Sequence, residues 1–145
     1  MTSVVGRDEI EALIPHRGAM CLLDAVESWD DATIRCVTNS HRDAANPLRR
    51  DGQLAALHLV EYGAQAMAVH GGLAERAKGG KARPGLLVAV RDVTLEVARI
   101  DDIASPLTVS AKRLVANAGG WLYSFEVEAG EKKLAAGRVS VIPPK

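Results

Sequence analysis

Glu61 is the residue whose type and position most favour catalysis. It lies in the stretch QLAALHLVEYGAQAMAVH, residues 53–70, and it is the one formally charged residue there. An isolated carboxylate among apolar residues is disfavoured as an anion, and a carboxyl group that keeps its proton can act as a general acid. The alternative is a structural carboxylate, which caps a loop or pairs with a buried base such as His58, three residues earlier.

Gln65 follows Glu61 by one turn if this stretch is helical. Its amide could then orient the Glu61 carboxylate or a substrate oxygen, or it could pack in the helix with no further role. The two cysteines, Cys21 and Cys36, lie in apolar alternating segments without a CxxC or Cys/His ligand spacing. We therefore expect buried, reduced thiols and no metal site.

Basic residues gather on both sides of this stretch. They are Arg49 and Arg50 before it and Arg76, Lys78, Lys81 and Arg83 after it. A small basic patch beside a pocket would steer an acidic partner toward it, whereas the alternative is a solvated loop.

The composition narrows the class of protein. At 145 residues and 48% hydrophobic, the chain is expected to form one domain, residues 1–145, with a proper core. Eighteen basic residues balance eighteen acidic ones, so nucleic acid is not an expected partner. Acidic residues interrupt the N-terminal region and no apolar segment is long enough to span a bilayer, so we expect a soluble cytoplasmic protein.

The hydrophobic pattern predicts an α+β fold. A long helix over residues 53–77 is apolar on nearly every side, which is typical of a helix enclosed by other elements. Before it, the pattern predicts a short helix at residues 8–14, a hairpin of strands 20–29 and 32–39, and a loop at 40–51. After it come four strand-like segments that we expect to form a meander: 85–100, 106–117, 120–130 and 132–142. A sheet wrapped around one central helix satisfies this order.

Four stretches, in order, resemble the β-hydroxyacyl-ACP dehydratase family. They are Ile14-Pro15-His16-Arg17 with the following MCLLDAV, Leu59-Val60-Glu61 with Ala64-Gln65, residues 87–95, and the closing GWLYSFEVEAGEKKLAAGRVSVI. In detail the sequence looks closest to the divergent dehydratase-like proteins found with aryl polyene biosynthesis. The resemblance implies a hotdog fold, in which an antiparallel sheet wraps around the long helix.

The resemblance also implies site residues. Glu61 would donate a proton to the departing hydroxyl of a 3-hydroxyacyl thioester, and backbone N–H groups near Ala56 or Leu57 would polarise the thioester carbonyl. The family's proton-abstracting histidine is replaced here by Asn46, which has no group that titrates near neutral pH. Asn46 could still bind a substrate carbonyl or hydroxyl by hydrogen bonding.

Two histidines are candidates for the missing base. His41 could swing toward the site, although an ordinary solvent-facing loop histidine is the first expectation. His58 could share the pocket with Glu61 or be a satisfied core residue. His16 is expected to be structural, and His70 to interact favourably with the C-terminal end of the helix dipole.

Three functions follow, in order of preference. The first is a dehydratase that uses no cofactor and acts on a thioester of acyl carrier protein or CoA. The second is a non-catalytic subunit of a hotdog heterodimer, which binds the acidic carrier protein through the basic residues named above. The third is an acyl thioesterase, in which Glu61 activates water or attacks the thioester. Exposed sheet edges usually pair, so we expect at least a dimer, either homodimer or heterodimer.

Overall fold

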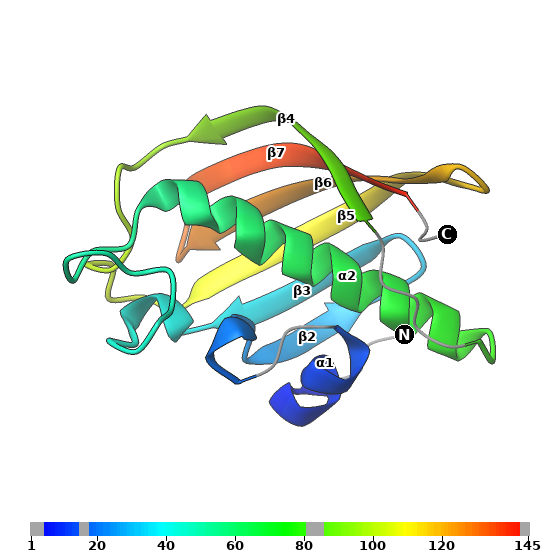
Figure 1. The fold of residues 1–145 in the computed structure, drawn as a ribbon, viewed down its shortest axis with the longest axis horizontal. Coiled ribbons are helices and arrows are strands. Elements are labelled where there is room, and N and C mark those ends of the chain that lie inside the picture. Colours follow the sequence, from blue (N-terminus) through cyan, green and yellow to red (C-terminus); the bar gives the residue numbers. More distant parts are fainter. Residues whose placement is uncertain (1–4, 15–17, 81–85, 143–145) are drawn as a thin grey trace.

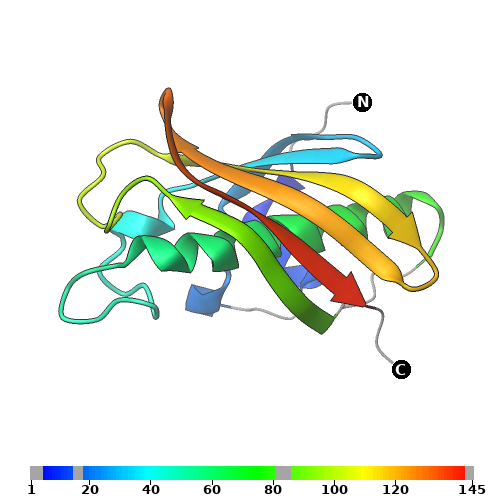
Figure 2. The same ribbon diagram turned by 90° about the horizontal axis from the view of Figure 1, so that it is seen from above.

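A curved antiparallel sheet and one long helix dominate the computed structural model, which describes residues 5–14, 18–80 and 86–142. The strands are β1 (Val5–Gly6), β2 (Ala25–Trp29), β3 (Thr33–Thr38), β4 (Leu86–Leu95), β5 (Leu107–Asn117), β6 (Gly120–Ala129) and β7 (Lys132–Ile142). The long helix α2 (Leu59–Ala77) crosses the concave face of the sheet, and the short helix α1 (Arg7–Leu13) lies beside it (Figures 1 and 2). This arrangement confirms the α+β hotdog fold.

The strand order in the sheet is β1-β2-β3-β5-β6-β7-β4. The β5, β6 and β7 strands form the expected meander, but β4 pairs with β7 instead of β5. The prediction of a four-stranded meander is therefore wrong for β4. The end of α2 lies beside α1, where Arg76 pairs with Glu9. The next strand, β4, lies at the opposite edge of the sheet from β1, and β5 then pairs with β3 (Figure 1).

The long helix begins later than the predicted residue 53. The single-turn 3₁₀ helix Ala56–His58 precedes α2, and the backbone before it bonds to a distant segment. Ile100 N–H donates to the Leu54 carbonyl, and Ala56 N–H donates to the Ala98 carbonyl, each at 2.9 Å. These hydrogen bonds to residues 98–100 replace the helical ones, and a propensity pattern contains no sign of them.

One side of α2 is less covered than the sequence predicted. The side facing the sheet is buried, with Leu59, Tyr62 and Val69 each fully inaccessible. A stripe on the other side stays partly exposed and comprises Val60, Glu61, Ala64, Ala68 and Gly71. The sheet therefore encloses α2 on one side, and Glu61 lies on the open stripe.

Both cysteines are buried and reduced, as predicted. Burial raises the pKa of the Cys36 thiol to about 12, because a thiolate would be poorly solvated there. The pKa of Cys21 is also raised, again mainly by burial. Neither thiol is therefore in an environment that promotes nucleophilic chemistry.

Candidate active site around Glu61

Glu61 lies in the first turn of α2 with its side chain partly exposed. Gln65 Nε2 lies 3.4 Å from Glu61 Oε1, so the expected one-turn relationship between the two side chains is present. Glu61 is thus held on α2 and still reachable from outside.

The Gln65 amide is buried and fastens the chain segment beside Glu61. Gln65 Oε1 accepts a hydrogen bond from Leu22 N–H at 2.9 Å, and Nε2 donates to the Met20 carbonyl at 2.8 Å. These bonds also explain why the predicted strand 20–29 begins only at Ala25. The Leu22 N–H and the Met20 carbonyl bond to this side chain of α2, and the Leu22 carbonyl accepts from the hydroxyl groups of Thr38 and Ser40. Side-chain hydrogen bonds therefore take the place of a backbone ladder there.

Asn46 is buried and its side chain is fully engaged. Nδ2 donates to the Ser40 carbonyl at 2.9 Å and to the Tyr62 hydroxyl at 3.2 Å. Oδ1 accepts from Leu48 N–H at 2.9 Å. The amide therefore joins the loop before α2 to the helix residue that follows Glu61.

Ser40 and Tyr62 extend this network and were not singled out in the sequence. Ser40 Oγ lies 2.9 Å from the Tyr62 hydroxyl and 2.7 Å from the Leu22 carbonyl, to which it donates. Burial raises the pKa of Tyr62. The available signal was a tyrosine inside an otherwise apolar helix, since a buried phenol usually needs a hydrogen-bond partner.

His41 is not the solvent-facing loop residue that the sequence predicted. Its ring is inaccessible, and Nε2 lies 3.0 Å from the Ile103 carbonyl. A carbonyl only accepts, so Nε2 carries the hydrogen, while the buried Nδ1 has no partner within the described residues. Burial lowers the pKa of His41, which favours the neutral ring. The prediction failed because Ile103 is distant in sequence.

The other two histidines that the structure describes differ sharply. His70 is inaccessible, with Nδ1 2.6 Å from the Tyr123 hydroxyl and Nε2 2.8 Å from the Asp30 carbonyl. It therefore joins α2 to β6 and to the β2–β3 turn. His58 is partly exposed in the turn that precedes Glu61. His16 lies outside the described residues.

The two expected backbone donors differ in their surroundings. Ala56 N–H donates to the Ala98 carbonyl, so this hydrogen is already used. Leu57 has a side chain that is 62% exposed at the beginning of the helical region. Of the two expected donors, the Leu57 N–H is therefore the remaining candidate for polarising a carbonyl.

The four basic residues of this set that the structure describes differ in their contacts. Arg49 donates to the backbone carbonyls of His41, Asp43 and Gly52, which fastens its own loop. Arg76 pairs with Glu9 at 2.9 Å, whereas Arg50 and Lys78 are exposed. Lys81 and Arg83 lie outside the described residues.

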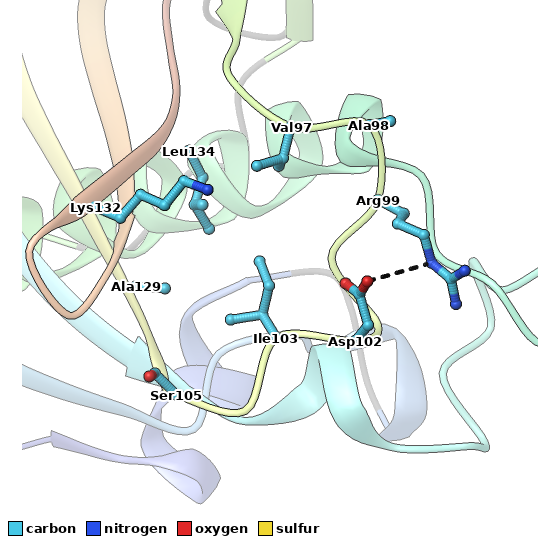
Figure 3. Close-up of a pocket in the computed structure, with 9 residues that line it drawn as sticks. All are labelled: Val97, Ala98, Arg99, Asp102, Ile103, Ser105, Ala129, Lys132 and Leu134. Atoms are coloured by element: carbon cyan, nitrogen blue, oxygen red, sulfur yellow. Dashed lines mark ion pairs between the residues drawn. The ribbon is translucent and has the colours of Figure 1, made fainter.

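A cavity of about 540 Å³ lies at one end of the sheet, beside the beginning of α2 (Figure 3). Its lining residues are Val97, Ala98, Arg99, Asp102, Ile103, Ser105, Ala129, Lys132 and Leu134. Arg99 forms an ion pair with Asp102 at 3.9 Å in its wall. None of the residues predicted for the site lines this cavity. The His41 ring lies beside it, with Nε2 3.0 Å from the carbonyl of the lining residue Ile103.

The described residues include neither a cluster of potential metal ligands nor a helix that could span a membrane. No cluster of three histidine, cysteine or carboxylate side chains is arranged to bind a metal ion there. In the same part of the chain, the helices are too short or too polar to cross a bilayer.

Comparison with known proteins gives a family and a fold. Residues 8–145 match the model of the ApeP-like family, described as ApeP dehydratase. Curated protein sequences contain no significant match. A chain of the dehydratase heterocomplex ApeI:P from Xenorhabdus doucetiae is similar, with a TM-score of 0.84 and 24% identity over 94% of this chain and 91% of that one.

Two thioesterases share the fold at lower similarity. One is a hypothetical thioesterase with coenzyme A from Streptococcus pneumoniae, with a TM-score of 0.61 and 11% identity over 81% of this chain and 86% of that one. The other is zebra fish thioesterase superfamily member 2, with a TM-score of 0.64 and 16% identity over 95% of both chains.

Proposed function

Because the chain belongs to the ApeP-like dehydratase family, we propose that it takes part in the elimination of water from 3-hydroxyacyl thioesters, with Glu61 as the general acid. Family membership confirms the resemblance to the dehydratase-like proteins of aryl polyene biosynthesis. The chain is therefore a dehydratase-like hotdog protein, and the roles of its residues are our proposal.

The proposed chemistry needs one acid and one base. A base removes a proton from the carbon next to the thioester carbonyl, and the electron pair forms the carbon–carbon double bond. The bond from carbon 3 to the hydroxyl breaks, and Glu61 protonates the departing oxygen, which leaves as water. Leu57 N–H would polarise the carbonyl during proton removal. The product is the 2-enoyl thioester.

The hydrogen bonding of Asn46 is the main support for a second proposal, an active site formed by two chains. Both polar atoms of its amide are committed within the chain, and the resemblance implies that it stands where the family has its base. The buried rings of His41 and His70 each contact a backbone carbonyl. We therefore propose that the base comes from a second hotdog chain. His58 is the candidate base if the protein acts alone.

The free edge of β4 is where we propose that the second chain binds. β4 pairs with β7 on one side, and it is the terminal strand of the sheet. Leu87, Val90 and Leu95 are 47%, 38% and 40% exposed on this strand. A paired chain would cover these side chains and continue the sheet. The similar dehydratase heterocomplex from Xenorhabdus doucetiae supports association with a second chain, and the β4 edge as its place is our proposal.

The acyl group would arrive on an acidic carrier protein or on CoA. Arg50 and Lys78 are exposed cations, one before the beginning of α2 and one after its end. Of the six basic residues predicted to bind the carrier, we propose this role for these two. Arg49 and Arg76 already bond within the chain.

A Glu61→Gln variant tests this proposal in the complex with the catalytic partner. We expect the elimination rate to fall by roughly 10²–10⁴, the usual contribution of a general acid or base. Glu75→Gln is the matched control, because Glu75 is a partly exposed carboxylate on the same helix. If Glu61→Gln retains full activity, Glu61 is structural and the proposal is wrong. Release of a free fatty acid in place of the enoyl thioester would instead identify a thioesterase.

A further inference from the structure

Two arginines face each other at the edge of the sheet. Arg91 of β4 lies directly opposite Arg138 of β7 in the antiparallel register. Directly opposed residues project to the same face of a sheet, so both side chains lie together on the convex face. Both residues are exposed. A like-charged pair in this position is destabilising, so the pair calls for an explanation beyond folding.

The nearby carboxylate of Asp92 only partly balances these charges. Asp92 Oδ2 lies 3.9 Å from Arg138 Nε, and the Asp92 side chain is 74% exposed. Asp92 has a left-handed backbone, with φ of 55°, at an irregularity of the β4–β7 pairing. The edge therefore carries two cations and one anion in each chain.

Self-pairing through β4 would double this excess of positive charge. The pairing of β4 with β7 is irregular between Leu87 and Ala89 and between Arg91 and Thr94, so the longest regular run of β4 is residues 89–91. If two copies pair antiparallel around Val90, Arg91 of each copy lies diagonal to Arg91 of the other, about 7–8 Å away. Four guanidinium groups then gather beside the two-fold axis, with Arg138 of each copy behind its Arg91.

We propose that Arg91 and Arg138 disfavour self-pairing through β4 and select a hotdog partner whose edge strand carries carboxylates on its convex face. This inference rests on the β4 pairing proposed above and adds the chemistry that chooses the partner. Carboxylates opposite Arg91 and Arg138 would convert the repulsion within this chain into attraction across the interface. The unfavourable arginine pair then contributes to specificity, because it destabilises the self-paired dimer relative to the complex with the partner.

Arg91→Glu tests this inference, with Lys112→Glu as its control. Lys112 lies in the same cross-strand row, which continues through Ser124 to Arg138, but it is on β5 and away from the free edge. We would measure self-association of each purified full chain by sedimentation velocity at low and high salt. The same chains would then be titrated with the catalytic hotdog partner.

The expected results separate charge selection from other forms of pairing. Arg91→Glu should strengthen self-association by roughly ten-fold or more at low salt and weaken binding to the partner by a similar factor. Added salt should strengthen wild-type self-association and weaken that of Arg91→Glu, since salt screens repulsion and attraction alike. Lys112→Glu should behave as wild type. Self-association that is unchanged in Arg91→Glu, or wild-type self-association that is insensitive to salt, would overturn the inference.

Val90→Asp separates this inference from the proposed function. A carboxylate at residue 90 should break any complex that pairs through β4, whatever the charge on its convex face. Leu87→Asp repeats this test at a second exposed position. If Val90→Asp and Leu87→Asp leave the partner bound, the pairing through β4 is wrong, and the inference is overturned with it. If they release the partner while Arg91→Glu changes nothing, only the charge selection fails.

Discussion

Gln65 Nε2 lies 3.4 Å from Glu61 Oε1 while it donates to the Met20 carbonyl at 2.8 Å. One buried amide therefore contacts the proposed acid and also fastens the segment beside it. We propose Gln65 as a positioning residue, because its amide contacts Glu61 and bonds to the backbone of Met20 and Leu22.

Replacing Gln65 with leucine should cost about 2 kcal/mol or more of unfolding free energy. The variant leaves Met20 O and Leu22 N–H buried without their partner, and unsatisfied buried groups are expensive. Urea denaturation measures this cost. Gln53→Leu, at an exposed position, should change stability by less than about 0.5 kcal/mol. Equal effects of the two variants would contradict the role of Gln65.

Asn46→His should not create a lone dehydratase. The Asn46 amide donates to two oxygens and accepts from Leu48 N–H, and an imidazole cannot reproduce that set. We expect lower stability and no elimination by the variant alone, followed by mass spectrometry of the thioester. Water elimination by the lone variant would mean that Asn46 faces the substrate and that the network around it is dispensable.

Two glycines of α2 should respond in opposite directions to alanine. A Cβ on Gly63 would lie 2.5 Å from Phe125 Cγ, so Gly63→Ala should cost about 1–3 kcal/mol by overpacking. A Cβ on Gly71 meets nothing within 4 Å, so Gly71→Ala should stabilise by about 0.5–1 kcal/mol. Thermal and urea unfolding measure both. If Gly63→Ala leaves the unfolding free energy unchanged, α2 does not pack as closely on Phe125 of β6 as the structure indicates.

The protein should lose stability as the pH falls below about 6.5, the ordinary pKa of histidine. Burial lowers the pKa of His70 and of His41, so the unfolded chain binds more protons than the folded one between the folded pKa and 6.5. Stability is then full above 6.5 and falls with acidification, by at most about 1.4 kcal/mol per pH unit for each histidine.

Urea unfolding between pH 7.5 and 5.5 measures this slope. His70→Asn removes one of the two groups, so it should be less stable at pH 7.5 and show a shallower loss on acidification. Stability that stays flat or rises as the pH falls would contradict the buried, neutral state of these rings.

Local sequence patterns were sufficient to predict most helices and strands, and also the contact between Glu61 and Gln65. The alternation over residues 132–142 predicted β7 with its observed bounds, because a half-buried strand repeats every two residues. The spacing of Glu61 and Gln65 predicted their contact, because residues four apart lie on the same face of a helix.

Contacts between distant residues were beyond such patterns. The Ile103 carbonyl beside the His41 ring is 62 residues away in the sequence. The Tyr62 hydroxyl, which accepts a hydrogen bond from Asn46, is 16 residues away in the sequence. The position of β4 beside β7 likewise depends on pairing between segments about 50 residues apart, such as Val90 with Val139. These features arise from tertiary packing, and no local propensity encodes them.

The most direct test of the central claim compares three samples with a 3-hydroxyacyl carrier-protein thioester. They contain this protein alone, a catalytic hotdog partner from the same genome alone, and both together, with products followed by mass spectrometry. The account predicts loss of water at the full rate only in the mixture, because Glu61 and the base come from different chains. Full elimination by this protein alone would contradict the shared site and would place the base within this chain.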